Sequence, residues 1–234
     1  MMYGWKSDSV DSLRSLVQEF RRMRKDGMQV ELEAKLGTSD ERNHFEVGLN
    51  QDMFSYLKGW IKNMETNDMH DYFFTLRSRM VRSRVEMNRY DFVNKVTNTY
   101  KSRIKTVVLL PDEDGSTLSV KFTLSLESPV TSDLPGVVKP EKVRLIQRST
   151  HQVRKFGRLV WAYDFSDTWM DQTREKVEEL QMNDEGRHEV ELELVDEGDM
   201  YLSKHDDDYI TDSFLIKLKE LLSCTNIHLD KCMS

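Results

Sequence analysis

The chain has 234 residues, of which 32% are charged and 38% are hydrophobic. That length suits one large mainly β or mixed domain, and the composition is typical of a globular protein with much polar surface. The net charge of −7 argues against a protein that coats nucleic acid through bulk positive charge, so a phosphate-bearing partner needs a local basic cluster. The two cysteines, Cys224 and Cys232, give no disulfide framework. No apolar run reaches membrane-spanning length and no signal-peptide core is present, so we expect a soluble intracellular protein.

The first part of the chain changes from helical to strand periodicity. Residues 8–25 carry apolar side chains at helical spacing, Asp8 or Ser9 is a candidate cap, and Gly27 follows the end. Residues 29–36 then alternate polar and apolar side chains strictly, which predicts a strand. A second helix is predicted over about 51–64, where apolar residues again recur at helical spacing.

Strand-like segments dominate the region from Tyr72 to Asp167. They cover 72–77, 79–87, 92–96, 99–110, 118–128, 142–153 and 158–166. A charged stretch over about 171–182 predicts a short exposed helix, residues 188–195 alternate again, and a final helix is predicted over about 208–222. No repeat, linker or low-complexity tract interrupts this order. We therefore predict one domain over residues 1–234, with antiparallel strands within about 29–196 and helices packed outside.

Two of these strands concentrate glutamates on one face. Because successive side chains of a strand point to opposite faces, Glu31 and Glu33 share a face with Lys35, and the three glutamates within 189–193 share another. Same-face neighbours lie about 7 Å apart, so the carboxylates repel, and an ordinary exposed strand would interleave Lys or Thr. Divalent cations such as Mg²⁺ bind carboxylate oxygens readily and would supply the missing charge.

A single Glu-x-Glu strand is most often an exposed polar face. Here one such strand opens the predicted sheet and another closes it. Since the first and last strands of a closed barrel are neighbours, the two strands together favour a shared site over two exposed faces.

Basic residues are concentrated between positions 77 and 105. They are Arg77, Arg79, Arg82, Arg84, Arg89, Lys95, Lys101, Arg103 and Lys105. Arginine forks and lysine charges are the donors that a triphosphate needs. For any one of these residues, ordinary surface charge is the simpler interpretation. Several of them share strand parity, as Lys101 does with Arg103 and Lys105, which favours a common face.

Later strands each have one apolar and one hydrophilic face. The hydrophilic faces carry Lys121, Thr123, Ser125 and Glu127 on one strand, Arg144, Arg148 and Thr150 on another, and Asp164 and Ser166 on a third. A soluble sandwich shows the same pattern with its polar faces outward. The predicted helices need an apolar surface to cover, which favours a mainly β (α+β) barrel with a polar interior and helices outside.

Taken together, these segments resemble the metal-dependent RNA triphosphatases of fungi, protists and large DNA viruses, which are triphosphate tunnel metalloenzymes. The resemblance covers roughly residues 29–196. It rests on Val-Glu-Leu-Glu-Ala-Lys-Leu-Gly (30–37), Val-Lys-Phe-Thr-Leu-Ser-Leu-Glu-Ser-Pro-Val (120–130) and His-Glu-Val-Glu-Leu-Glu-Leu (188–194). It implies a closed eight-stranded antiparallel tunnel that uses Mn²⁺ or Mg²⁺ to hydrolyse the γ-phosphate of 5′-triphosphate RNA, the first step of mRNA capping.

The resemblance also implies roles for individual residues. The metal ligands would be Glu31, Glu33 and Glu193. Glu127 would orient or deprotonate the attacking water, and Glu189 and Glu191 would hold metal-bound waters or basic side chains. The phosphate-binding positions would be Lys35, Arg84, Lys101, Arg103, Lys121, Arg144 and Arg148, with Asp164 and Ser166 matching a family Asp-x-Thr pattern.

Two positions depart from the pattern of yeast-type members. Ile146 stands where they have a lysine, and Ala162 stands where they have an arginine. Either the alignment slips locally, or the chain rearranges its phosphate clamp with Arg154 or Lys142.

Other functions fit part of the sequence. The motif Glu31-x-Glu33-x-Lys35 also matches tunnel enzymes that act on tripolyphosphate or thiamine triphosphate, or that cyclise ATP. A non-catalytic β-barrel binding module would leave the acidic strands unexplained. Cys224, His228 and Cys232 would give zinc three ligands where four are usual, so a frayed tail is the simpler interpretation. The RNA triphosphatase prediction carries expected partners: 5′-triphosphate RNA, free NTPs, an mRNA guanylyltransferase and a second copy in a homodimer. No membrane is among them, and the expected location is the nucleus or a viral factory.

Overall fold

The computed structural model describes residues 4–40, 44–76, 79–87, 93–111, 118–130 and 139–232, with side chains at all of these except Asn94 and residues 224–232. Arg77 and Arg89 lie outside the described residues, as do the side chains of the Cys224, His228 and Cys232 trio.

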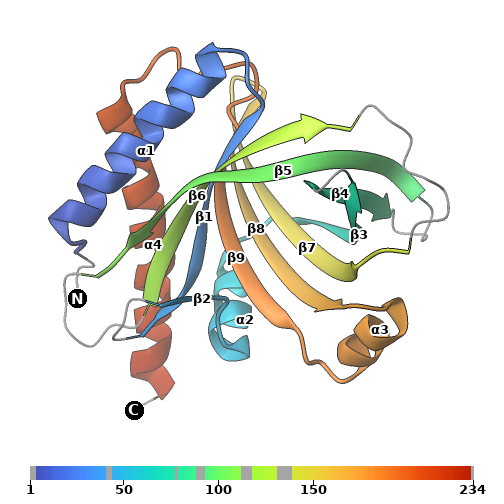
Figure 1. Cartoon of the computed structure of the whole chain (residues 1–234). Helices are drawn as coiled ribbons and strands as arrows, with labels where there is room; N and C mark the ends of the chain where they lie inside the picture. The colour runs from blue at the N-terminus through green and yellow to red at the C-terminus, as the bar shows by residue number, and fades with distance from the viewer. Residues whose placement is uncertain are drawn as a thin grey trace.

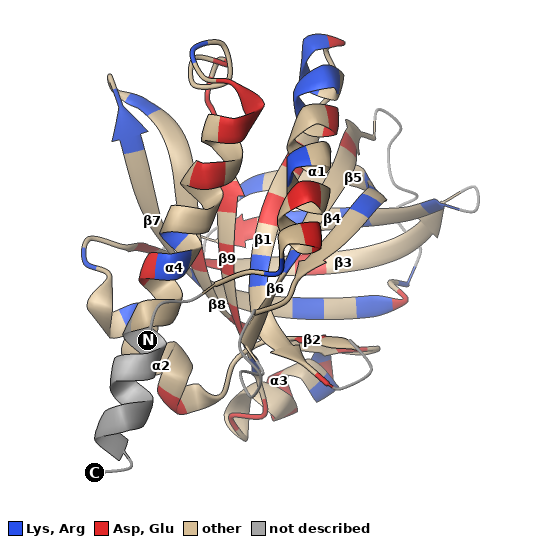
Figure 2. Ribbon diagram, turned by 90° about the vertical axis from the view of Figure 1, so that its left-hand side faces the viewer, with Lys and Arg blue, Asp and Glu red and all other residues tan. Residues whose placement is uncertain are grey.

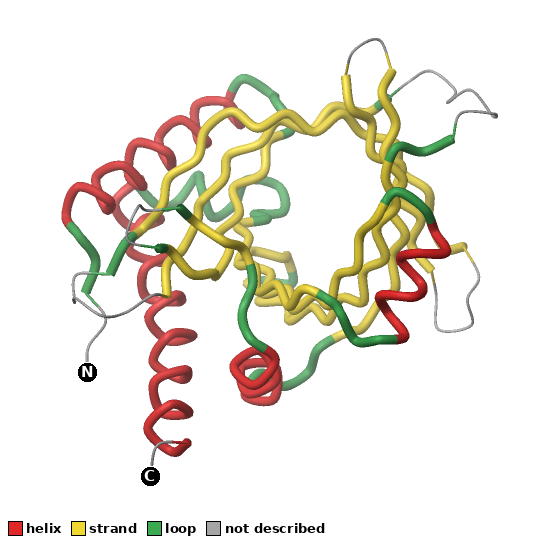
Figure 3. The backbone as a smooth tube through the Cα atoms, turned by 60° about the horizontal axis from the view of Figure 1, so that its bottom comes forward, coloured by secondary structure: helices red, strands yellow, loops and turns green. Residues whose placement is uncertain are grey.

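The described strands form a single antiparallel sheet in the order β2-β1-β6-β5-β4-β3-β7-β8-β9. Their bounds are β1 Val30–Ser39, β2 Phe45–Val47, β3 Glu65–Leu76, β4 Arg79–Met87, β5 Val93–Leu109, β6 Leu118–Pro129, β7 Lys142–Lys155, β8 Arg158–Asp171 and β9 Arg187–Leu194. An additional pairing of β1 with β9 closes the sheet on itself, with Glu33 opposite Glu193 and Lys35 opposite Glu191. The resulting ring contains eight strands, with β2 added beside β1. Figure 3 shows the closed ring of strands from one end. The predicted closed eight-stranded barrel is confirmed.

Within the described ranges, four helices pack against the outside of the barrel. They are α1 Ser7–Lys25, α2 Gln51–Trp60, α3 Arg174–Met182 and α4 Asp207–Cys232. Figure 1 shows α1 and α4 together on one side of the barrel, while α3 lies at the far ends of β7 and β8. None of the described helices is long and apolar enough to cross a membrane.

The main hydrophobic core lies between the barrel wall and the helices rather than inside the barrel. Leu32 of β1 and Phe122 of β6 are fully buried there against apolar residues of α1 and α4. Trp161 of β8 meets Phe214 of α4 edge to face, with ring centroids 4.7 Å apart. Burying one such side chain contributes roughly 1.5–3 kcal/mol. The apolar faces of the strands therefore point outward, and their polar faces are left for the interior.

Several predicted boundaries were wrong. The helix predicted over 51–64 begins after its cap, Asn50, and ends at Trp60. The Asn50 side chain accepts a hydrogen bond from the backbone amide of Met53. Residues 65–71 are the start of β3, although they lack apolar alternation, because they pair with β7 along 144–150. The segments predicted as 92–96 and 99–110 form one strand, β5, and the short β2 was missed.

Candidate active site

The inner face of β1 carries the first acidic residues. Val30, Leu32, Ala34 and Leu36 are buried under the helices, so the alternation of the strand turns Glu31, Glu33 and Lys35 into the barrel. In Figure 2 the acidic runs of β1 and β9 lie next to each other in the barrel wall. The two glutamate strands predicted from the sequence therefore do meet in one place.

Glu33 and Glu193 form a directly opposed acidic pair across β1 and β9. Burial, together with the charges of Glu31 and Asp164, raises the pKa of Glu193 to about 8. Burial and the charge of Glu191 also raise the pKa of Glu33. Like charges directly opposite each other destabilise a sheet, so this cluster needs positive charge.

Lys101 of β5 supplies part of that charge. Its Nζ atom lies 2.5 Å from a carboxylate oxygen of Glu31, 3.7 Å from one of Glu33 and 3.8 Å from one of Glu127. Although burial disfavours the charged amine, the surrounding glutamates hold the pKa of Lys101 above its ordinary value. Lys101 therefore lies among the predicted metal ligands as well as being a predicted phosphate contact.

Glu127 of β6 lies at the edge of the same cluster. Arg82 of β4 donates to its carboxylate at 2.9 Å. Burial and the neighbouring Glu31 raise the pKa of Glu127, which makes this carboxylate more basic than an exposed glutamate. Arg82 shares strand parity with Arg84, but the sequence analysis did not select it as a site residue.

The donor set fits a hard divalent cation. Glu31, Glu33 and Glu193 offer carboxylate oxygens from two adjoining strands, and Mg²⁺ and Mn²⁺ take such ligands together with water and phosphate oxygens. Within the described residues no three acidic, histidine or cysteine side chains converge as a ready metal cage. Lys101 instead occupies the space between Glu31, Glu33 and Glu127.

Glu189 and Glu191 are paired with Lys35 rather than left as open carboxylates. Lys35 Nζ lies 3.3 Å from Glu189 and 2.5 Å from Glu191. Burial alone would raise the pKa of Glu191, but Lys35 and Arg148 hold it well below its usual range. Glu191 is thus charged at neutral pH and orients Lys35 and Arg148.

Asp71 of β3 holds two of the predicted phosphate ligands and was missed from the sequence. Arg84 donates to both of its carboxylate oxygens, at 2.7 and 2.9 Å, and Arg144 of β7 donates to one of them. Asp71 has no solvent exposure, yet the two arginines hold its pKa well below the ordinary value against the effect of burial. The polar stretch 65–71 gave no strand periodicity, so nothing in the sequence placed Asp71 inside the barrel.

Arg148 joins the predicted Asp164 and Ser166. Its guanidinium lies 3.0 Å from Asp164 and donates to the Ser166 hydroxyl at 3.2 Å, and Thr150 donates to Asp164 at 2.5 Å. Burial raises the pKa of Asp164 even so. Asp164 and Ser166 therefore hold the guanidinium of Arg148 in place, and their predicted part in phosphate binding stays a prediction.

Lys121 and Arg103 are the predicted phosphate-binding cations that have no acidic partner among the described residues. Lys121 lies directly opposite Lys35 across β6 and β1, and its Nζ atom stands 4.7 Å from the centre of the Phe45 ring. Burial and the charge of Arg103 lower the pKa of Lys121. Neither Lys121 nor Arg103 forms an ion pair with any residue in the described ranges. Two facing lysines beside an arginine form a site that attracts an anion.

Lys105 does not belong with Lys101 and Arg103. A β-bulge between Arg103 and Lys105 shifts the register, so Lys105 pairs with Leu124, whose side chain lies in the outer core. The extra residue turns Lys105 away from the interior, an effect that parity counting cannot foresee.

Ile146 and Ala162, the two positions that depart from the yeast-type pattern, lie within the barrel wall in regularly paired parts of β7 and β8. Ile146 is buried on the same strand face as Arg144 and Arg148, opposite Met69. Ala162 lies opposite Glu193, so a small side chain faces the acidic pair. Arg154 and Lys142 are exposed near opposite ends of β7. Neither of these two residues replaces the missing lysine or arginine.

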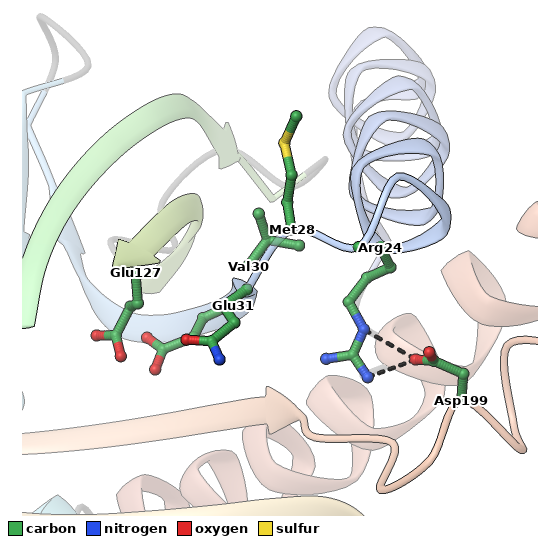
Figure 4. Close-up of a pocket in the computed structure, with 8 residues that line it drawn as sticks. Arg24, Met28, Val30, Glu31, Glu127 and Asp199 are labelled. Atoms are coloured by element: carbon green, nitrogen blue, oxygen red, sulfur yellow. Dashed lines mark hydrogen bonds and ion pairs between the residues drawn. The ribbon is translucent and has the colours of Figure 1, made fainter. Parts of the chain in front are cut away.

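The barrel opens through a pocket of about 300 Å³ at the end where α1 leads into β1. Its lining includes Glu31 and Glu127 inside, and Arg24 and Asp199 at the rim. Figure 4 shows the two glutamates side by side with their carboxylates pointing the same way, while Arg24 donates to Asp199 at 2.9 Å. The acidic cluster is therefore reached from this end.

Comparison with known proteins identifies the fold. No protein-family model matches the chain, and no curated protein matches it by sequence. The S. pombe Pct1 RNA triphosphatase matches with a TM-score of 0.64 and 18% identity over 92% of each chain. Its complex with the Spt5 CTD matches with a TM-score of 0.65 and 17% identity, over 92% of this chain and 93% of that one. The RNA triphosphatase domain of a trifunctional mimivirus mRNA capping enzyme matches with a TM-score of 0.57 and 16% identity, over 89% of this chain and 96% of that one. The chain therefore has the fold of the fungal and mimivirus RNA triphosphatases.

Proposed function

We propose that this chain is a divalent-metal-dependent hydrolase that removes the γ-phosphate from the 5′-triphosphate end of RNA. The product would be a 5′-diphosphate end, which is the substrate for the next step of mRNA capping. One observation carries the proposal. Along the inner face of β1, the acidic pair of Glu33 and Glu193 is followed at once by the basic pair of Lys35 and Lys121. The solved structures that share this fold and are named above are RNA triphosphatases, which supports RNA as the substrate to test first.

The acidic pair and Glu31 suit a Mn²⁺ or Mg²⁺ ion. Such an ion, held by Glu31, Glu33 and Glu193, would polarise the γ-phosphate and offset the charge that develops on it. Lys35 does not pair with these carboxylates, because it is engaged with Glu189 and Glu191, so Lys101 is the cation that an ion would displace from Glu31 and Glu33.

The basic residues are arranged to hold phosphate oxygens. Asp71 fixes the planes of Arg84 and Arg144, so that their remaining N–H groups are pre-oriented. Burial and the charges of Arg103 and Lys35 disfavour the charged form of Lys121, so a phosphate anion bound beside it would stabilise that form. Phosphoryl transfer depends mainly on such positioning and on charge neutralisation.

Glu127 is the candidate base for the attacking water. It borders the acidic cluster, it has a raised pKa, and Arg82 orients its carboxylate. A carboxylate that is more basic than usual accepts a proton from water more readily, and a correctly oriented one places that water in line with the γ-phosphorus.

Product analysis tests the proposal. RNA with a labelled γ-phosphate should yield orthophosphate and a diphosphate end when Mn²⁺ or Mg²⁺ is present, and excess EDTA should abolish the reaction. Pyrophosphate as the main product would contradict the proposal. So would rapid hydrolysis of tripolyphosphate without cleavage of RNA, the outcome expected of a tripolyphosphatase with the same barrel.

The expected product also defines the partner class. A diphosphate end is the substrate of an mRNA guanylyltransferase, and the mimivirus neighbour is a domain of a trifunctional capping enzyme. We propose the same association for this chain, in the nucleus or a viral factory. Co-purification with guanylyltransferase activity would support it.

A further inference from the structure

The turn between β7 and β8 exposes an aromatic side chain in a strained backbone conformation. Phe156 is 86% exposed and has a φ of 52°, and Gly157 follows with a φ of 79°. Two-residue hairpin turns with positive φ at both positions favour Asn-Gly or Gly-Gly, because a bulky side chain is disfavoured at the first one. Phe156 therefore serves neither the turn nor the core, and strained residues of this kind concentrate at functional sites.

Basic residues lie on either side of Phe156 in the hairpin, and one from another segment packs on its ring. Arg154, Lys155 and Arg158 flank it in the hairpin, and Lys204 from the segment before α4 places its Nζ atom 5.2 Å from the ring centre. These four residues and Phe156 are called the hairpin patch. In the part of the chain that the structure describes, none of its four cations forms an ion pair.

The acidic residues near the hairpin patch are already engaged. Asp199 accepts from Arg24 of α1 at 2.9 Å, and Glu197 accepts from the backbone amide of Leu159 at 2.9 Å. Lys155 also lies 4.9 Å from the centre of the Tyr201 ring. The hairpin patch thus presents positive charge and an open ring face together, although the whole chain is acidic.

The hairpin patch stands at the end of the barrel where the pocket opens. The last described β8–β9 pair is Trp161 with Leu194, next to Glu193 of the acidic pair. The hairpin continues beyond that pair, so its tip lies roughly 15 Å past Trp161 at the usual strand rise of about 3.3 Å per residue. Figure 1 shows the hairpin at the same end as the α1–β1 turn, and Figure 2 shows basic residues at its tip.

We infer that the hairpin patch binds the single-stranded RNA chain that follows the triphosphate end. A base stacks on Phe156, and Lys155, Arg158 and Lys204 contact backbone phosphates. Exposed rings flanked by cations are the usual platform for single strands. An acidic peptide would need the cations but not the ring. The inference rests on the proposed function, because the RNA it assigns to the hairpin patch is the part of the chain next to the triphosphate end in the barrel.

Substitutions at Phe156 separate binding from folding. Phe156→Asn creates an Asn-Gly turn, which should leave the melting temperature unchanged or raised. It should also raise the KM for triphosphate-ended RNA of about 16 nucleotides by roughly ten-fold, the scale of one lost base–aromatic stack. Phe156→Trp should retain the wild-type KM. Neither variant should change the hydrolysis of tripolyphosphate or of a triphosphate-ended dinucleotide, which do not reach the hairpin.

Charge substitutions supply a second readout. Lys155→Ala combined with Arg158→Ala should weaken binding of a 5′-monophosphate RNA, measured by fluorescence anisotropy. It should also reduce the slope of log affinity against log salt by about 0.7 for each lost phosphate contact. Lys176→Ala is the matched control, because Lys176 is an exposed lysine of α3 near the other end of β8.

The outcomes separate this inference from the proposed function. Unchanged KM and unchanged RNA affinity in both the Phe156 and the charge variants would overturn it while wild-type RNA hydrolysis persists. Loss of affinity in the charge variant but not in Phe156→Asn would also overturn it, because the cations would then hold RNA without a base stacked on Phe156. If the wild-type chain does not cleave RNA at all, the proposed function fails. The monophosphate RNA still tests the hairpin patch, because that measurement needs no turnover.

Discussion

The two faces of β1 have opposite effects on the stability of the fold. On the outer face, Leu32, Ala34 and Leu36 are almost completely buried under the helices and stabilise the fold. On the inner face, Glu31 and Glu33 crowd other carboxylates, and burial raises the pKa of Glu33. One strand thus carries both apolar residues that stabilise the barrel and acidic residues whose mutual repulsion destabilises it.

This difference separates the outer face of β1, which serves folding, from the inner face, which serves chemistry. An acidic cluster that only completed a core would be paired throughout, as Asp71 is with Arg84 and Arg144. Glu193 instead has its pKa raised to about 8, because burial and the neighbouring carboxylates of Glu31 and Asp164 disfavour its charged form. Substitutions on the two faces should therefore separate activity from stability.

The largest effect is expected from the acidic pair. Glu33→Gln and Glu193→Gln should each lower phosphate release by more than about 100-fold, because even residues that only support metal ligands are worth 10–100-fold. Thermal unfolding without metal should be unchanged or shifted upward, since a repelling charge is removed. Glu46→Gln, on exposed β2, is the control and should leave both quantities unchanged. A large loss of stability in the Glu33 or Glu193 variants would contradict the claim that the inner face of β1 does not stabilise the fold.

The outer face should respond in the opposite way. Leu32→Ala should lower the free energy of unfolding by about 2–5 kcal/mol, the usual effect of a cavity in a packed core. The kcat of the folded fraction should stay near the wild-type value. Denaturant unfolding and active-site titration measure the two quantities. A fall in kcat without loss of stability would contradict the assignment of the outer face to folding alone.

The basic side of the interior should show a moderate effect on activity. Arg84→Ala and Lys121→Ala should each reduce kcat/KM by roughly ten-fold or more, since a charge-assisted bond to phosphate contributes about 1.5–3 kcal/mol. Arg84→Ala should also destabilise the fold, because it leaves the buried Asp71 with Arg144 as its remaining partner. Lys121→Ala should not, because Lys121 has no carboxylate partner among the described residues. Equal kinetics of both variants and the wild type would show that Arg84 and Lys121 do not face the substrate.

The smallest effect at neutral pH concerns Asp71. Its pKa in the folded chain lies below the unfolded value, so its stabilising effect is fully present above about pH 4 and is lost as the pH falls through the folded pKa. The stability of the wild-type protein should therefore decline more steeply below about pH 4 than that of Asp71→Asn. Urea unfolding across that range measures the difference, and parallel curves would show that Asp71 carries no such linkage.

The sequence predicted the strands whose two faces differ most. β1 and β9 alternate cleanly, so their glutamates could be assigned to one face and brought together by closure of the barrel. The start of β3 could not be predicted, because its pairing with β7 is non-local and its own residues are mainly polar. Asp71 was missed for that reason.

The details of the phosphate clamp depended on contacts that parity does not encode. Arg82 and Arg84 share a face, yet one orients Glu127 and the other Asp71. The bulge after Arg103 reverses the direction of Lys105. The hairpin patch combines β7–β8 with Lys204, nearly fifty residues away, so its assembly is visible in the fold alone.

Anomalous X-ray scattering from crystals of the protein grown with Mn²⁺ would test the central claim most directly. The account predicts a strong manganese peak inside the barrel, within coordination distance of carboxylate oxygens of Glu31, Glu33 and Glu193, with Lys101 displaced toward the phosphate side. A barrel interior without a manganese peak, or a peak bound only by acidic residues on the outer surface, would contradict it.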